Sequence, residues 1–234
     1  MERRVFLKSC ALIPGAGAIA AAAAATSEGA VRQHARVRLV DVHGAPLKAQ
    51  ALLAETNYIF DYPYVATPCL LVDIGRPLTT RAELVRQDGA RYAWEGGVGR
   101  KRSIVAFSAI CAHKLAYPTR DVSFIRYQPR ASATSDAQVI HCCADHSVYD
   151  PAGGARVISG PAPQPLAAIL LEHDSLSDEL VAFGTQGAEQ FEAFFEKYDF
   201  RLAMDYGRGR AREAVRDRAI VRELSQYSRQ SIQC

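Results

Sequence analysis

Cys111-Ala112-His113 and Cys143-Ala144-Asp145-His146 are the two stretches on which the rest of the chain depends. Each supplies one thiol and one imidazole, the first with the spacing C-x-H and the second with C-x-x-H. Two cysteines and two histidines in two short loops are enough to hold a metal centre. Zinc ligand pairs usually lie two to four residues apart, which C-x-x-H satisfies and the tighter C-x-H does not. The asymmetric spacing therefore favours a centre other than zinc, with structural zinc or two ordinary buried histidines as the alternatives.

The residues around the two pairs predict short strands that end at the ligands. Residues 103–110 are apolar and rich in β-branched and aromatic types, which predicts a core strand that delivers Cys111. Residues 122–127 and 138–141 predict a hairpin whose second arm delivers Cys143. Further strands are expected at 36–42, 57–60, 69–73, 156–158, 166–171 and 180–183, with another possible at 49–54 and a short helical or irregular turn at 81–90. Many short strands punctuated by Gly and Pro indicate an all-β sandwich or small barrel.

At this point residues 62–184 resemble the Rieske iron–sulfur family. Glu95-Gly-Gly-Val-Gly99 and Ile104-Val-Ala-Phe-Ser-Ala-Ile-Cys-Ala-His-Lys114 look like the first cluster box of the arsenite oxidase small subunit. Ser147-Val-Tyr-Asp-Pro151 looks like the tail of its second box, and Gly160-Pro-Ala-Pro163 like the proline-rich loop of cytochrome bc Rieske subunits. The resemblance implies an antiparallel β-sandwich over residues 36–186, with a smaller cluster-binding subdomain at about 104–165.

The resemblance also implies the cofactor, one [2Fe–2S] cluster per chain. Cys111 and Cys143 would hold one iron as thiolates, and His113 and His146 would hold the other iron as neutral imidazoles. Replacing thiolate by imidazole removes negative charge, so such clusters have potentials of roughly −150 to +300 mV.

Four further residues are expected beside the cluster. Ser147 and Tyr149 match hydroxyl donors to cluster sulfur, and Pro161 lies in the covering loop. The usual Gly after the second His is missing, so the register of Ser147 and Tyr149 is shifted. Lys114 stands where members of bc complexes carry a Leu that enters the quinol pocket, which favours the arsenite oxidase type.

The remaining cysteines separate this chain from high-potential members. Those proteins join a second Cys in each box by a disulfide, and here the matching positions are Ala116 and Asp145. Cys142 is an extra cysteine without an obvious partner, and Cys69 is expected to be a small buried hydrophobe. Cys234 is expected to be unimportant, or free to form an intermolecular disulfide.

The N-terminus predicts export. Glu2-Arg-Arg-Val-Phe-Leu-Lys8 resembles the twin-arginine signal, and a mildly apolar Ala- and Gly-rich stretch follows to residue 25. Residues 1–26 are therefore a signal cleaved near Thr26 or a retained membrane anchor, and 27–35 a linker. The resemblance implies passage through the twin-arginine machinery and a periplasmic location, with an anchor in the inner membrane if the segment is retained.

The C-terminal residues 187–234 are predicted to form a helical extension. Residues 190–198 place Phe191, Phe194 and Phe195 on one helical face, and 208–226 show an apolar stripe at helical spacing. This extension either packs on its own domain or docks a partner subunit or an anionic surface. The net charge of +3 on 234 residues gives no argument for nucleic acid.

The leading expectation is a periplasmic one-electron carrier. It rests on the resemblance to the arsenite oxidase small subunit. Its partners would be a larger oxidoreductase subunit and a cytochrome c-type acceptor, and the chain would not be catalytic alone. A Rieske subunit of a quinol–cytochrome c complex is the first alternative. A zinc-stabilised exported β-domain without a redox role is the remote one.

Overall fold

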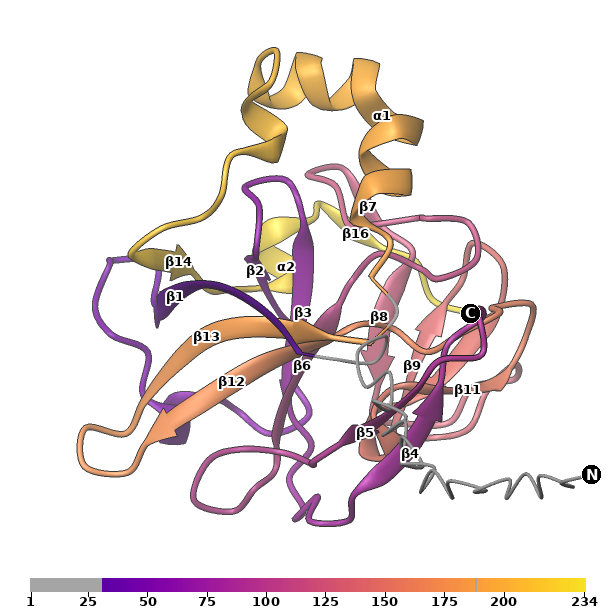
Figure 1. The fold of residues 1–234 in the computed structure, drawn as a ribbon. Helices are drawn as coiled ribbons and strands as arrows, with labels where there is room; N and C mark the ends of the chain where they lie inside the picture. Colours follow the sequence, from indigo (N-terminus) through magenta and orange to yellow (C-terminus); the bar gives the residue numbers. More distant parts are fainter. Residues whose placement is uncertain (1–30, 188) are drawn as a thin grey trace, which may run out of the picture.

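The computed structural model describes residues 31–187 and 189–234, which form a mostly β structure with one long helix (Figure 1). The first strands are β1 (Arg32–Val40), β2 (Tyr58–Asp61), β3 (Pro68–Asp73), β4 (Ala82–Val85), β5 (Arg91–Trp94), β6 (Ile104–Ser108), β7 (Val122–Ser123) and β8 (Ile125–Gln128). They are followed by β9 (Val139–Cys142), β10 (Ser147–Asp150), β11 (Arg156–Ser159), β12 (Ala168–Asp174), β13 (Glu179–Gln186), β14 (Arg218–Ile220), β15 (Arg222–Glu223) and β16 (Gln230–Ser231). The helices are α1 (Phe191–Tyr206) and α2 (Leu224–Tyr227), with short 3-10 turns at Ala49–Ala51, Pro151–Gly153 and Arg210–Arg212. The predicted all-β class with a C-terminal helix is confirmed.

An eight-stranded sheet, in the order β14-β1-β13-β12-β6-β3-β2-β15, forms the body of the molecule. Its neighbouring strands β6, β3 and β2 are buried on both faces, which is why β3 and β6 read as continuous apolar runs. Alternate side chains enter two different cores: Ile59, Leu70 and Phe107 enter one, and Phe60, Leu71 and Ala106 enter the other. Strand β6 is thus fixed from both sides where it leads to Cys111.

A four-stranded sheet, in the order β11-β10-β9-β8, lies at one end of the large sheet (Figure 1). The predicted hairpin is confirmed, because β8 and β9 pair antiparallel from Ile125↔Cys142 to Gln128↔Val139. Strand β10 continues the sheet, with Ser147 opposite Cys142. The small sheet therefore carries the second candidate stretch as the turn between β9 and β10.

Three local predictions are wrong. The expected strand at 49–54 contains the 3-10 turn Ala49–Ala51, held from outside by Asp178, whose backbone carbonyl accepts the Ala49 N–H at 2.8 Å. The expected turn at 81–90 contains β4, which pairs with the unpredicted β5 and buries Leu84 against it. The expected linker 27–35 overlaps β1, which begins at Arg32. The twin-arginine signal lies outside the described residues.

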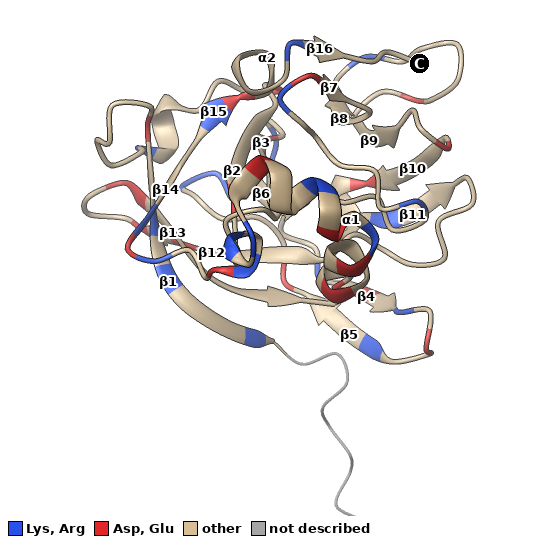
Figure 2. Ribbon diagram, turned by 90° about the horizontal axis from the view of Figure 1, so that it is seen from above, with Lys and Arg blue, Asp and Glu red and all other residues tan. Residues whose placement is uncertain are grey.

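The C-terminal extension packs on its own domain. Helix α1 forms as predicted, with Phe191, Phe194 and Phe195 buried on one face. No helix spans 208–226, however, because after α1 the chain supplies β14 and β15, which pair with the outer strands β1 and β2 of the large sheet. These pairings cover backbone groups that would otherwise stand open at the sheet edges. Figure 2 shows acidic and basic residues along α1.

Within the described residues, no helix has the length and apolar character that crossing a bilayer requires.

Candidate metal centre

The first loop follows β6 and is closed by its own backbone. The Cys111 N–H donates to the Ala116 carbonyl at 2.9 Å, and the Leu115 N–H donates to the Cys111 carbonyl at 2.9 Å. Leu115 adopts a left-handed φ of 57° to complete the turn. As a result Cys111 is fully buried, while the side chain of His113 is 36% exposed at the tip.

The second loop is the tight turn from Cys142 to Ser147. The His146 N–H donates to the Cys142 carbonyl at 2.7 Å, and His146 has a left-handed φ of 59°. Along β9 the side chains alternate, so Ile140 and Cys142 both enter the core that contains Cys111. His141 points to the opposite side of the strand.

Four side chains of these two loops converge. The ligand atoms of Cys111, Cys142 and Asp145 all lie within 4.8 Å of one another. Asp145 Oδ2 is 3.2 Å from Cys111 Sγ and 2.9 Å from His113 Nδ1. The carboxylate of Asp145 is only 2% exposed. Two thiols, one carboxylate and one imidazole therefore meet where the loops touch.

The structure does not bring the four predicted ligands together. Cys143 is bonded to Cys234 in a disulfide, and a sulfur in a disulfide offers no thiolate to a metal. The ring of His146 lies beside that of His141, with the centroids 5.5 Å apart. Three cysteine predictions are thereby corrected: Cys142 has a partner in Cys111, Cys143 has one in Cys234, and Cys234 forms its bond within the chain.

The local hydrogen bonds stabilise negative charge at two of the four groups. A hydrogen bond from the Cys142 thiol lowers the pKa of Cys111 to about 7, and Tyr149 and backbone N–H groups add to this effect against the cost of burial. The same bond raises the pKa of Cys142 well above its usual value. Burial raises the pKa of Asp145, but hydrogen bonds from Ser147 and Cys111 outweigh it and hold the pKa below its usual value.

The other residues predicted beside the centre occupy different positions. Tyr149 is buried with its hydroxyl 3.5 Å from Cys111 Sγ, and it accepts the Ala112 N–H at 3.2 Å. Ser147 uses its backbone N–H, which donates to Asp145 Oδ1 at 3.0 Å, while its buried hydroxyl has no partner in the described residues. Lys114 and Pro161 are exposed.

The loop that contains Pro161 lies against the second candidate loop. Gly160 has a φ of 88°, and a Cβ there would lie 2.3 Å from the His146 carbonyl oxygen. Only glycine permits this approach. The 160–163 loop therefore helps to fix the turn that presents Asp145.

Helix α1 supports the first loop, a feature that sequence reasoning missed. The Gln190 side chain donates to the Ala112 carbonyl at 2.7 Å, and Lys197 Nζ donates to the Lys114 carbonyl. Leu115 packs in the same core as Phe194. The proximity of Cys142 and Asp145 to Cys111 was also missed, although the alternation that puts Cys142 in phase with Ile140 was readable in the sequence.

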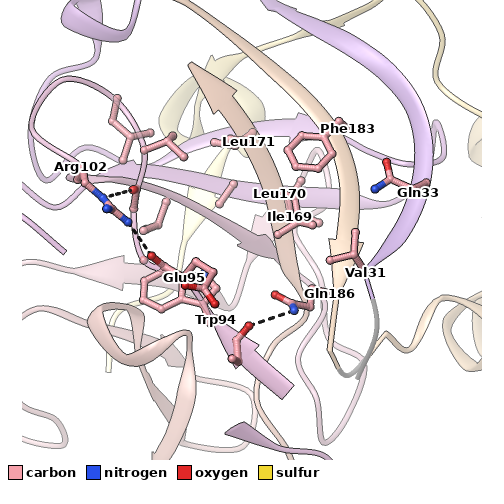
Figure 3. Close-up of a pocket in the computed structure, with 17 residues that line it drawn as sticks. Val31, Gln33, Trp94, Glu95, Arg102, Ile169, Leu170, Leu171, Phe183 and Gln186 are labelled. Carbon is pink, nitrogen blue, oxygen red and sulfur yellow. Dashed lines mark hydrogen bonds between the residues drawn. The ribbon is translucent and has the colours of Figure 1, made fainter. Parts of the chain in front are cut away.

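A cavity of about 490 Å³ lies elsewhere, between β5, β6, β12 and β13 (Figure 3). Two of its polar side chains have backbone partners: Arg102 donates to the Glu95 carbonyl at 2.7 Å and Gln186 to the Ala93 carbonyl at 3.1 Å. None of the four converging ligand groups lines this cavity.

No family model matches the chain. Among solved structures, the soluble domain of the Rieske protein II (soxF) from Sulfolobus acidocaldarius is similar at 27% sequence identity, with 65% of this chain and 78% of that chain covered. The TM-score is 0.46.

Proposed function

We propose that this chain is a one-electron carrier with a Rieske-type [2Fe–2S] cluster, held by Cys111 and Cys142 on one iron and by His113 and Asp145 on the other. The observation that supports it is the convergence of two buried thiols with one buried carboxylate and one exposed imidazole, all from two adjacent loops. The proposal keeps the expected cofactor and replaces Cys143 and His146 in the ligand set.

The donor groups fit this cofactor in number and in their sulfur half. A Rieske cluster takes two thiolates on one iron and two imidazoles on the other. Here the second half offers one imidazole and one carboxylate, and iron accepts oxygen ligands of this kind. The ligand set predicted from sequence does not fit, because Cys143 is in the disulfide.

When bound, the cluster would supply reversible one-electron transfer. The protein groups around it hold charge and exclude water. Hydrogen bonds from Cys142 and Tyr149 favour the thiolate form of Cys111, the Ser147 N–H orients the Asp145 carboxylate, and the core around Tyr149 seals the sulfur side. Because Asp145 carries a negative charge where a neutral imidazole is usual, the potential should lie low in the family range.

The exposed imidazole marks the face through which electrons would pass. His113 stands at the surface beside the charged Lys114, away from the sealed sulfur side. We place the chain in the periplasm, exported by the twin-arginine route, as a small subunit or partner of a larger oxidoreductase with a cytochrome c-type acceptor. The arsenite oxidase type is preferred to a quinol–cytochrome c complex because a lysine at this tip is a poor fit to an apolar quinol pocket.

Metal analysis joined to electron paramagnetic resonance tests this function. The purified full chain should contain two iron atoms and two acid-labile sulfides per chain, and after dithionite reduction it should give a Rieske-like signal with a midpoint in the lower part of the range. Zinc without iron would instead select the zinc-stabilised domain. A chain that takes up neither iron nor sulfide, even after reconstitution, would refute the electron-transfer proposal.

A further inference from the structure

A second cluster of metal-ligating side chains lies on the other side of β9. One ligand atom each from His141, His146 and Cys234 lies within 4.8 Å of the other two. Cys143 joins them through its bond to Cys234. None of these four residues belongs to the converging set of Cys111, Cys142, His113 and Asp145.

His141 is the buried member of this group of three. It is fully buried, and neither of its ring nitrogens has a hydrogen-bond partner in the part of the chain that the structure describes. Its neighbour is the ring of His146, inclined at 63°. A buried imidazole without partners loses the hydrogen bonds it would make in water, and a bound metal ion would compensate for that loss.

The disulfide holds the remaining ligands in a protected form. While Cys143 and Cys234 are bonded to each other, neither sulfur is a thiolate. Reduction by a thiol or phosphine breaks the S–S bond with two electrons and two protons and gives two thiols. Binding of a divalent metal then releases both thiol protons to solvent.

We infer that, once the Cys143–Cys234 disulfide is reduced, His141, His146, Cys143 and Cys234 form a zinc site. Two thiolates and two imidazoles are a usual structural zinc set, and metal–ligand bonds of about 2.0–2.3 Å put tetrahedral ligands ~3.3–3.8 Å apart. The ligand atoms of His141, His146 and Cys234 already lie within 4.8 Å of one another, and Cys143 is bonded to Cys234, so about 1 Å separates the observed upper limit from that range. Two thiolates also neutralise the ion, which suits a site close to the guanidinium of Arg126.

The geometry makes zinc and the disulfide alternatives. Each uses the same two sulfurs to tie the C-terminus to the β9–β10 turn. The chain would thus be closed by zinc under reducing conditions and by the disulfide under oxidising conditions. This inference does not depend on the proposed cluster, because the two sites share no ligand.

Zinc titration of the full chain in its two redox states tests the inference. Protein treated with a phosphine reductant should bind one zinc ion per chain more than the oxidised protein. His146→Ala should remove that additional ion or weaken it by at least about 100-fold, whereas His113→Ala should leave it in place. His43→Ala, at an exposed turn, is the matched control and should change nothing.

Alkylation provides a second measurement that works even if a variant folds poorly. In the reduced wild-type chain, zinc should protect Cys143 and Cys234 from iodoacetamide, as read by mass spectrometry of their peptides, and should raise the melting temperature. Equal zinc uptake in both redox states, or unchanged alkylation of Cys143 and Cys234 with zinc present, would overturn the inference.

Discussion

The disulfide between Cys143 and Cys234 should contribute a large part of the stability, and Cys234→Ser measures it. The bond closes a loop with a sequence separation of 91 residues. The loss of chain entropy in the unfolded state for a loop of that length corresponds to about 4.6 kcal/mol at 25 °C. For a chain of this size, that loss lowers the melting temperature by about 10–15 °C.

Urea unfolding followed by tryptophan fluorescence is the assay. Trp94 is the single tryptophan and is buried at 4% exposure, so unfolding changes its environment. Cys234→Ser, Cys143→Ser and their double variant should lose the same free energy, because all three remove one bond. Wild-type protein in reductant and a metal chelator should match them. Equal stability of Cys234→Ser and untreated wild type, or additive losses in the double variant, would refute the reasoning.

Three further predictions concern single residues. Burial raises the pKa of Asp61 to about 7 against the opposing charges of Arg120 and Arg222, so the folded chain binds this proton more tightly than the unfolded chain does. Stability should therefore fall as pH rises from about 4 to 7, by at most about 4 kcal/mol, and Asp61→Asn should abolish that fall in urea titrations. Asp145→His replaces a negative ligand with a neutral one. Removing a unit charge about 5 Å from the added electron, at an effective dielectric constant near 20, makes reduction of the cluster about 3 kcal/mol more favourable. The midpoint should therefore rise by about 130 mV in a redox titration. An unchanged or lower midpoint would place Asp145 away from the iron. Phe194→Ala should cost about 3–5 kcal/mol in unfolding free energy and speed hydrogen exchange in the first loop, because Phe194 packs in the same core as Leu115; unaltered exchange there would separate α1 from the loop.

The sequence predicted the strands that lie in the middle of the fold. Residues 103–110 and 138–141 are rich in apolar residues, which predicts buried strands. Both form strands in the structure, β6 and β9. Helix α1 was readable for the same reason, because its phenylalanines recur at helical spacing. Where a local pattern decides burial, the sequence was sufficient.

The errors arose where distant contacts decide the structure. Residues 208–226 have a helical stripe, but the open edges of β1 and β2 offer their backbone groups partners that no local pattern reveals. The 3-10 turn at Ala49–Ala51 likewise depends on Asp178, far along the chain.

The ligands that the sequence pattern selects and those that the structure brings together differ by one residue of register. The C-x-x-H spacing selects Cys143, whereas the alternation of β9 puts Cys142 beside Cys111. The pairing of Cys143 with Cys234 joins residues that are separated by most of the C-terminal half, so spacing alone gave no sign of it.

The most direct test of the account replaces each of the two adjacent cysteines with serine, one at a time. Iron and acid-labile sulfide are measured in Cys142→Ser and Cys143→Ser, together with the spectrum after dithionite reduction. The account predicts that Cys142→Ser loses the cluster and that Cys143→Ser keeps it at reduced stability. Loss of the cluster in Cys143→Ser with retention in Cys142→Ser would contradict the account and restore the ligand set expected from sequence.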